Sequence, residues 1–465
     1  MIRSFFKIIL LVLSINSVTA ESSDVAAKFN RILSKYPKLG LHGISILESQ
    51  TGKIVYEKNG SSLLNPASAL KVLISGIAFD QLGLDHVFKT QVKGNAEKLC
   101  LIGGGDPSLV QEQLYALAEI TQQRLAPQKA ISELIVDDTL FKSENPYDPS
   151  FSGDAHRAFT ADIGALSTNF NSIGIRVEPT ALGAPGKISI TPDIPQIKVK
   201  NTTRTTSTGG KKSIGIRVAL TKNNHYLVHV FGNVSIKGYR GEDFFTLYAS
   251  IPSKPALFSG YIFADALNSR GLTINNISEG RCPNNTKELF TWDSKPLSSI
   301  IRDMNIYSNN FIAETLLRHV TPSHDRIGGI DVMRTWIKNH HIKNGSAFQL
   351  DNASGLSRKN QISANTLAHI FHKNMSSILY GPEFLSSLSI NGLTGTMKNR
   401  LKGSDDQFVI RGKSGTLNNA VSLVGRAQSL EKDFIFSFIF NNSGYSVYQL
   451  QNLENTLLKS LLESP

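Results

Sequence analysis

The chain has 465 residues, of which 40% are hydrophobic, so it is long enough for two or three domains with true cores. Its formal net charge is +12, but the basic residues are dispersed, and no helix-turn-helix or zinc-finger spacing occurs. These features argue against nucleic acid binding, although a basic protein can still meet anionic polymers of a cell surface. The two cysteines, Cys100 and Cys282, do not make a zinc site, and whether they pair is left open. We expect neither a metal nor a cofactor.

Residues 1–20 have the layout of a secretory signal peptide. Arg3 and Lys7 precede an apolar run at residues 8–13, and the segment ends in the small residues of a cleavage site. The apolar run is too short for a comfortable membrane span, and no later stretch is long enough for a transmembrane helix. We therefore predict cleavage after residue 20 and an extracytoplasmic, periplasmic-type location with at most peripheral membrane association. The alternative is an uncleaved N-terminal anchor.

The first elements after this leader are a short amphipathic helix at residues 24–36 and a hairpin of two strands, 43–48 and 53–57. The next stretch, residues 65–82, carries the functional argument. It begins with an Asn-Pro turn signal, continues as a helix with an apolar face, and is followed by Gly83, a plausible helix stop.

Ser68 and Lys71 are three residues apart on this helix, so they project from the same face. A serine hydroxyl is a poor nucleophile until a neighbouring base takes its proton. Lys71 can be that base only when it is uncharged, and its reference pKa of about 10.4 must then be lowered by burial or by a second cation. This spacing is common in helices, so its meaning depends on groups supplied later in the chain.

The middle of the chain, residues 89–253, favours short strands and loops. Strands are expected at 98–102 and 133–136, with a helix at 108–123 between them. A polar loop is expected at 202–210. Five further strands are predicted at Gly174–Val177, Lys187–Ile190, Gln196–Val199, Ser213–Thr221 and His225–Ile236. We interpret this part as a β-rich insertion of two small domains, the second at roughly residues 171–250.

Helical patterns return after residue 254, followed by three strands and a last helix. Helices are expected at 256–268, 298–318 (as one helix or a pair), 330–339, 363–373 and 447–462, and strands at 407–413, 420–427 and 432–441. Together with the N-terminal hairpin and helix, these elements predict one α/β (α+β) domain, built from residues 21–88 and 254–465, in which helices flank an antiparallel sheet.

Two further motifs bring polar side chains that suit a shared cleft. Ser308 and Asn310 are two residues apart and offer a hydroxyl and an amide. Lys413-Ser414-Gly415-Thr416 ends a strand, so Lys413 and Gly415 face one side and the two hydroxyls face the other. The glycine would let a substrate backbone approach the strand. Each motif is common when it stands alone.

The ordered set Ser-x-x-Lys, Ser-x-Asn and Lys-Ser-Gly is the triplet of penicillin-recognising serine enzymes. With its elements in this order, the chain resembles the low-molecular-mass class C penicillin-binding proteins, which are D-alanyl-D-alanine carboxypeptidase/endopeptidases that trim peptidoglycan. The resemblance covers nearly all of the mature chain, including an insertion between the first two motifs. Supporting stretches are Gly104–Pro107, Val136–Asp138, Ala165–Asn171, Asp351–Ser357 and Gly392–Thr396.

The resemblance implies an acyl-enzyme mechanism and a role for each motif residue. Ser68 would attack the carbonyl between the two terminal D-alanines, and Lys71 would take its proton. Ser308 would relay a proton to the leaving amine, while Asn310 would hold an amide of the acyl side chain. Lys413 would be the second cation, which lowers the pKa of Lys71 and attracts the substrate carboxylate.

The remaining site residues lie on the strand of the third motif. Ser414 and Thr416 would bind the substrate carboxylate or backbone beside Gly415, and the N–H groups of Ser68 and Thr416 would form the oxyanion hole. A β-lactam would mimic the dipeptide and leave a slow adduct on the enzyme. The family usually has Thr where Ser414 stands, so we expect altered carboxylate affinity.

Two other readings are weighed against this one. A β-lactamase with the same triplet would need a deacylating carboxylate, but between Ser308 and Lys413 only Glu314 and Glu383 occur, and neither lies in a Glu-x-x-Leu-Asn setting. A catalytically silent cell-wall-binding protein would not need an intact triplet. The sequence leaves open the balance of carboxypeptidase and endopeptidase action, the oligomeric state, and whether the insertion limits access to the cleft or docks on the wall.

Overall fold

A computed structural model describes residues 23–142, 157–207, 213–237, 243–340, 342, 348–403 and 407–463. The expected leader at residues 1–20 lies outside these ranges, as do residues 208–210 of the expected polar loop. Among the residues described, no helix combines the length and apolar character needed to span a bilayer. In the same ranges, no group of His, Cys, Asp and Glu side chains could hold a metal ion.

The chain forms two compact units. The first unit contains the residues up to Asp85, Leu297–Asn309 and those from Arg326 onward, and the second contains His86–Pro296 and Asn310–Asp325. The sequence predicts that the insertion ends at residue 253. The structure assigns residues 254–296 to the second unit, because the helix in this segment packs on the second unit's own strands.

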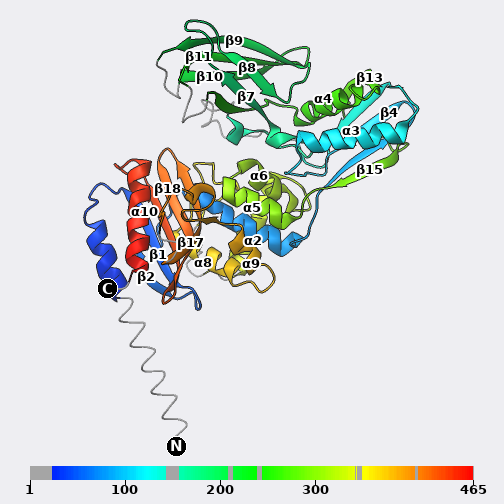
Figure 1. The fold of residues 1–465 in the computed structure, drawn as a ribbon. Helices are drawn as coiled ribbons and strands as arrows, with labels where there is room; N and C mark the ends of the chain where they lie inside the picture. The colour runs from blue at the N-terminus through cyan, green and yellow to red at the C-terminus, as the bar shows by residue number, and fades with distance from the viewer. Residues whose placement is uncertain are drawn as a thin grey trace, which may run out of the picture. The chain divides into compact units, whose positions relative to one another are not determined.

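The first unit is built around a six-stranded antiparallel sheet with the order β16-β17-β18-β19-β1-β2 (Figure 1). β1 pairs with β19, so segments from the two ends of the chain share one sheet, as predicted. The strands are β1 (Leu41–Glu48), β2 (Ile54–Lys58), β16 (Ser389–Ile390), β17 (Phe408–Leu417), β18 (Ala420–Ser429) and β19 (Asp433–Asn441).

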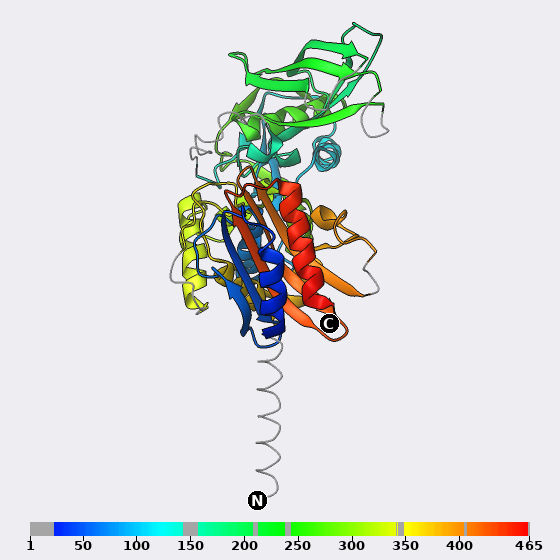
Figure 2. The same ribbon diagram turned by 90° about the vertical axis from the view of Figure 1, so that its left-hand side faces the viewer.

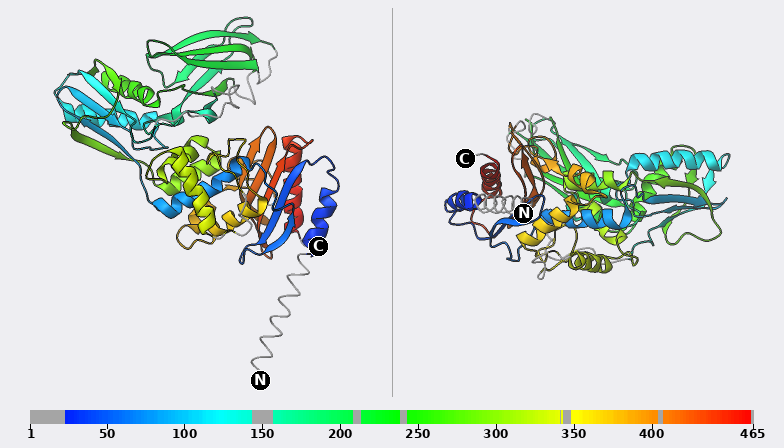
Figure 3. Two further views of the ribbon diagram at one scale, coloured as in Figure 1. Left: turned by 180° about the vertical axis from the view of Figure 1, so that it is seen from behind. Right: turned by 90° about the horizontal axis from the view of Figure 1, so that it is seen from below.

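Helices cover both faces of this sheet. The helix at residues 23–33 and α10 (Val447–Leu462) lie on one face, where Phe29, Phe438 and Leu453 belong to one buried cluster (Figure 2). On the other face, η1 (Ala67–Leu70) packs on β17 and β18, and α8 (Ala364–Met375) packs on the central strands (Figure 3). The unit also contains α2 (Lys71–Leu82), α5 (Leu297–Tyr307), α7 (Arg326–Asn339), α9 (Gly381–Ser386) and η6 (Gly395–Met397).

The second unit contains a five-stranded sheet with the order β14-β6-β4-β3-β15, two three-stranded sheets, β12-β7-β8 and β10-β11-β9, and a two-stranded sheet, β13-β5. A disulfide joins Cys100 on β4 to Cys282. Buried side chains of the five-stranded sheet and of both three-stranded sheets belong to one hydrophobic cluster. The strands are β3 (Lys89–Gly94), β4 (Lys98–Ile102), β5 (Ala130–Ile131), β6 (Glu133–Asp137), β7 (Ser172–Glu178), β8 (Lys187–Thr191), β9 (Ile197–Thr206), β10 (Ile214–Leu220), β11 (Tyr226–Ser235), β12 (Phe245–Ser250), β13 (Thr273–Ile274), β14 (Ile277–Glu279) and β15 (Lys287–Asp293). The helices are α3 (Gln111–Leu125), α4 (Pro255–Asn268), α6 (Asn310–His319), η3 (Ala158–Thr160) and η4 (Asn169–Asn171).

The structure corrects the expected loop at residues 202–210. Its first five residues, Thr202–Thr206, belong to β9, which pairs in parallel with β11 along its whole length. Threonine is β-branched and favours extended backbone, so a run of threonines suits a strand although it is polar. Composition alone suggested a loop because none of these side chains is strongly hydrophobic.

The helical pattern at residues 298–318 is a pair of helices, α5 and α6, one of the two expected arrangements. The break falls on the second motif. Ser308 has a left-handed backbone, with φ of +56°, which ends α5 immediately before the motif continues. Non-glycine residues rarely adopt this conformation, and such residues are concentrated at functional sites.

Candidate active site

The sequence predicts that Ser68 lies inside a continuous α-helix, and this prediction is wrong. Ser68 lies on the short 3₁₀ turn η1, and α2 begins at Lys71. In a 3₁₀ turn, residues three apart eclipse each other, which aligns the two side chains. The Nζ atom of Lys71 is 2.9 Å from the Oγ atom of Ser68. Lys71 is fully buried, whereas Ser68 is only partly buried and remains accessible for reaction.

The turn is held from both sides. The Asn65 side chain accepts a hydrogen bond from the backbone N–H of Ala67 at 2.9 Å and donates one to the carbonyl of Ser357 at 3.0 Å. A Cβ atom on Gly415 of β17 would lie 2.7 Å from the carbonyl oxygen of Pro66 and 2.8 Å from the backbone nitrogen of Ala69. The absence of a side chain at Gly415 therefore lets the strand pack directly against the residues that flank Ser68.

The backbone carbonyl of Ser354 is a third group at the Ser68–Lys71 pair. It accepts a hydrogen bond from Lys71 Nζ at 2.6 Å and one from Ser68 Oγ at 3.3 Å. The next residue, Gly355, has a φ of +78°, and a Cβ atom there would collide with the carbonyl of Ala67. The Ser354 carbonyl can reach the pair only because this position is a glycine.

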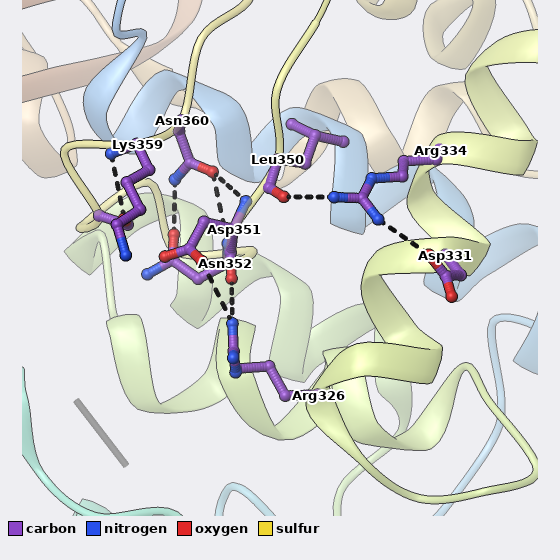
Figure 4. A network of polar contacts seen from close by, with 9 residues as sticks. Arg326, Asp331, Arg334, Leu350, Asp351, Asn352, Lys359 and Asn360 are labelled. Carbon is purple, nitrogen blue, oxygen red and sulfur yellow. Dashed lines mark hydrogen bonds and ion pairs between the residues drawn. The ribbon is translucent and has the colours of Figure 1, made fainter. Parts of the chain in front are cut away.

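The loop that carries Ser354, residues 350–361, is tied down by polar contacts (Figure 4). Asn360 is fully buried and accepts hydrogen bonds from the backbone of Asp351 at 2.8 Å and of Asn352 at 3.3 Å. Its amide nitrogen donates to the side chain of Asn352 at 2.6 Å. From α7, Arg326 and Arg334 donate to the carbonyls of Asp351 and Leu350, at 2.7 Å and 3.1 Å (Figure 4). The loop is therefore a preformed part of the site.

Lys413 and Ser308 form a second amine–hydroxyl pair. Lys413 Nζ donates to Ser308 Oγ at 3.0 Å and to the carbonyl of Ser414 at 2.7 Å. Lys413 is fully buried, and burial lowers its pKa to about 7. At neutral pH a substantial fraction of the amine is therefore uncharged. Until an anion binds beside it, Lys413 carries less positive charge than its predicted role as a second cation requires.

Ser414 and Thr416 project from the opposite side of β17 to Lys413 and Gly415, as strand alternation requires. Ser414 Oγ donates to Thr396 Oγ1 at 2.7 Å, and the backbone N–H of Thr396 donates to Ser389 Oγ at 3.2 Å. The hydroxyl of Ser414 is thereby oriented by a neighbour on η6. Thr416 is exposed at the end of the strand.

Asn310 is the first residue of α6 and belongs to the second unit. Its amide nitrogen donates to the carbonyl of Phe159 on η3 at 3.1 Å. The contact orients the Asn310 side chain within its own unit. The role expected for Asn310 stays a prediction.

Three groups of the site carried no predicted role: the Ser354 carbonyl, Asn360 and Thr396. Ser354 and Thr396 lie in Asp351–Ser357 and Gly392–Thr396, two stretches that support the family resemblance. The sequence therefore marked these stretches but did not indicate what either residue does. A backbone carbonyl has no signature in a sequence, because every residue has one.

The arrangement suits acyl transfer. A partly exposed hydroxyl contacts a buried amine, and Gly415 of β17 packs against the residues that flank this hydroxyl. A second hydroxyl contacts a second buried amine next to a strand that ends in hydroxyl groups.

Comparisons with known proteins agree with this chemistry. The chain matches the D-Ala-D-Ala carboxypeptidase 3 (S13) family over residues 25–460. A D-alanyl-D-alanine carboxypeptidase of Actinomadura sp. is 26% identical over 432 residues, which cover 87% of this chain and 78% of that protein.

Solved structures share the fold. Penicillin-binding protein 4 from Haemophilus influenzae matches with a TM-score of 0.77 and 20% identity, over 94% of this chain and 99% of that one. The same protein in complex with a β-lactam matches with a TM-score of 0.72. A predatory peptidoglycan endopeptidase from Bdellovibrio bacteriovorus matches with a TM-score of 0.52 and 15% identity, over 90% of this chain and 92% of that one. Because the family match spans nearly the whole chain, the protein belongs to the D-Ala-D-Ala carboxypeptidase 3 (S13) family and is a serine-type D-Ala-D-Ala carboxypeptidase.

Proposed function

We propose that this protein cleaves D-alanyl bonds of peptidoglycan, in stem peptides and in cross-links, through a covalent acyl-enzyme on Ser68, and that β-lactams acylate the same hydroxyl. The observation that carries the proposal is the 2.9 Å contact between the buried amine of Lys71 and the partly exposed hydroxyl of Ser68. A hydroxyl in hydrogen-bond contact with an amine is the minimal unit of a serine nucleophile and its base.

In this proposal Ser68 Oγ attacks the carbonyl carbon of the D-Ala–D-Ala bond while Lys71 takes the proton. The N–H groups of Ser68 and Thr416 bind the developing oxyanion, and losing one such donor typically costs about 10²–10³ in rate. Ser308 then relays the proton held by Lys71 to the nitrogen of the leaving D-alanine, which departs as the amine. Lys413 supports this step, since its amine donates to Ser308 Oγ at 3.0 Å. Water finally attacks the ester and frees Ser68.

The carboxylate of the substrate is assigned to the Lys413 amine and to the hydroxyls of Ser414 and Thr416. Binding of an anion beside Lys413 raises its pKa again and restores the charged amine, so substrate binding and protonation of Lys413 support each other. Asn310 is proposed to hold an amide of the acyl side chain, which is the role of the asparagine in the Ser-x-Asn motif of the family that this chain resembles.

The test is mass spectrometry of the intact protein after incubation with benzylpenicillin. The wild-type protein is expected to gain the mass of one benzylpenicillin, and the Ser68→Ala variant is expected to gain none. Ser386→Ala is the matched control, because Ser386 is an exposed serine of the same unit on α9, and it should be labelled like the wild type. An adduct of equal yield on the Ser68→Ala variant would contradict the assignment.

The lifetime of the adduct separates this proposal from the β-lactamase alternative. We expect the adduct to persist and a chromogenic β-lactam to be hydrolysed slowly. Rapid multiple turnover of that β-lactam would favour the alternative and count against a peptidase role.

We also propose that the protein acts outside the cytoplasm. The layout of residues 1–20 and the disulfide between Cys100 and Cys282 support this location, because structural disulfides persist mainly in oxidising compartments. N-terminal sequencing of the protein from its native host should begin at Glu21. A mature chain that still begins at Met1 would indicate an uncleaved anchor instead.

A further inference from the structure

A cavity of about 490 Å³ lies in the second unit, on the solvent face of the three-stranded sheet β12-β7-β8. This volume falls within the range of about 300–1,000 Å³ that is usual for sites of small ligands. Every residue that lines the cavity belongs to the second unit, so it is separate from the Ser68–Lys71 pair of the first unit. No step of the proposed reaction uses it.

Strand alternation explains how this face became a site. Ile173, Val177 and Phe245 alternate with residues that line the cavity, do not line it themselves, and are buried in the core of the second unit. The intervening residues form two rows across the strands, paired in register, and both rows line the cavity. These rows are Tyr248–Gly174–Thr191 and Thr246–Arg176–Ser189.

The floor of the cavity combines an aromatic surface with open space. The Tyr248 side chain is 62% exposed, far more than a structural tyrosine needs to be. Gly174 lies beside it, and a Cβ atom there would meet only Tyr248 at 3.6 Å and 3.9 Å and Thr191 at 4.0 Å. The glycine therefore leaves open space beside the tyrosine ring.

Arg176 provides directed hydrogen-bond donors at this floor. Its guanidinium carbon lies 3.8 Å from the centre of the Phe244 ring, and its Nε atom is 2.9 Å from a carboxylate oxygen of Glu178. Stacking and the ion pair hold the guanidinium in place, and its charge is balanced by this carboxylate. A planar guanidinium has five N–H donors, so an ordered arginine can bind carbonyl and hydroxyl oxygens of a ligand.

One wall of the cavity is formed by Asn169 and Phe170, which have left-handed backbone conformations with φ of +55° and +56°. This strained conformation is costly and persists only where the surroundings impose it. Asn169 is held by its N–H, which donates to the carbonyl of Leu109 at 2.9 Å, and by its side-chain oxygen, which accepts from the N–H of Gln111 at 3.0 Å. The wall is therefore preformed, which reduces the entropy lost on binding.

We infer that this cavity binds a sugar segment of the peptidoglycan glycan chain, that is, a β-linked N-acetylated amino sugar. This inference rests on the proposed function, because the D-alanyl peptides of that substrate are attached to such a chain. A sugar ring presents apolar C–H faces and polar edges, which match an exposed aromatic ring surrounded by hydroxyls and an arginine. The lining contains one acidic residue, Glu112, and one basic residue, Arg176, whose charge Glu178 already balances, so the lining does not favour a polyanion.

The test uses β-1,4-linked N-acetylglucosamine trimer as the probe, titrated into the purified full chain and followed by ligand-observed NMR. We expect saturable binding with a dissociation constant of about 1 mM or tighter. Tyr248→Ala should weaken binding at least about tenfold. Gly174→Val should abolish trimer binding, because φ at this position allows a side chain and the valine would fill the space beside Tyr248.

The matched control is Tyr448→Ala, because Tyr448 is a 72% exposed tyrosine of the first unit, on α10. Tyr448→Ala should bind the trimer like the wild type. The melting transition of the second unit in differential scanning calorimetry should be the same in Tyr248→Ala and Gly174→Val as in the wild type, which shows that this unit is folded, and benzylpenicillin acylation in the first unit should be equal in all three variants. The inference is overturned if the wild type shows no saturable binding at 10-fold higher concentration than the expected constant, or if the Tyr248→Ala variant binds as tightly as the Tyr448→Ala control.

This experiment distinguishes failure of the inference from failure of the proposed function. If benzylpenicillin fails to label Ser68, the peptidase proposal is wrong whatever the trimer does. If labelling succeeds and the trimer does not bind, only the sugar site is wrong. When both hold, Tyr248→Ala should raise the KM for a glycan-linked peptide and leave the KM for the free peptide unchanged.

Discussion

Lys413 illustrates how burial changes the chemistry of a single residue. Its amine is fully buried and donates to two neutral oxygens, Ser308 Oγ and the Ser414 carbonyl. Burial disfavours the charged form and lowers the pKa to about 7 from the usual 10.5. Between these two values the unfolded chain holds a proton that the folded chain lacks. This residue's contribution to the free energy of unfolding therefore rises as the pH rises through that window.

The same shift predicts a pH dependence of acylation. Only the charged form of Lys413 attracts a carboxylate, so the acylation rate constant for benzylpenicillin at low concentration should fall above about pH 7, by up to about tenfold per pH unit. Lys413→Arg keeps its charge at all these pH values. In that variant the decline near pH 7 should disappear, although its maximal rate is expected to be lower.

Lys402→Arg is the matched control for this measurement, because Lys402 is an exposed lysine of the same unit. It should reproduce the wild-type pH profile. A decline near pH 7 that remains unchanged in Lys413→Arg would show that another group titrates there.

At the scale of elements, the reactive pair depends on a loop as much as on its own helix. Residues 350–361 place the carbonyl of Ser354 against Lys71 Nζ and Ser68 Oγ. The loop has no regular secondary structure to hold it, and the buried side chain of Asn360 takes over that role by bonding the backbone of Asp351 and Asn352.

Asn360→Asp is predicted to impair acylation although Asn360 does not touch the reacting atoms. The variant keeps an oxygen for the two backbone N–H groups but replaces the amide that donates to Asn352 with a second oxygen acceptor. The Ser354 carbonyl should shift, and a misplacement of about 1 Å can cost on the order of 10² in rate. Stopped-flow acylation with a fluorescent penicillin measures the effect.

Lys359→Ala is the control for the loop, because Lys359 is exposed and contributes only its backbone N–H, which donates to Ser357 (Figure 4). It should acylate at the wild-type rate. If Asn360→Asp is as fast as Lys359→Ala and equally stable, the loop does not position Lys71.

At the scale of the whole molecule, the two units have separate cores and the only disulfide among the residues that the structure describes lies in the second. Cys100 and Cys282 are 182 residues apart in the sequence, so their bond closes a very long loop. In the chain-entropy model, such a loop stabilises the folded state by up to about 5 kcal/mol.

Replacing both cysteines by serine is predicted to destabilise the second unit and to leave benzylpenicillin acylation in the first unit intact. Differential scanning calorimetry should show a lower melting temperature for one transition, and acylation should raise the other. Adding a reductant should lower the same transition in the wild type and have no effect on the double variant. Equal shifts of both transitions would show that the units unfold as one.

The sequence by itself determined the family, the antiparallel sheet shared by both chain ends, and the candidate groups of the site. These features are local or periodic: an alternation that marks β17, a turn signal before Ser68, and motifs that each lie within four residues. For this reason the sequence predicted the broad fold class, the N-terminal hairpin, the three C-terminal strands and α10.

Only the tertiary structure decided the conformation and surroundings of those groups. The hydrogen bond from Lys71 to the carbonyl of Ser354 joins segments 283 residues apart, and the lowered pKa of Lys413 depends on burial. The left-handed backbone at Ser308 is a conformation that serine rarely adopts, so the sequence does not predict it. Likewise β9 is a strand because β11 pairs with it. The identity of a residue does not show which backbone carbonyl it will contact, how deeply it will be buried or which strand will pair with it. These features are therefore decided only when the chain folds.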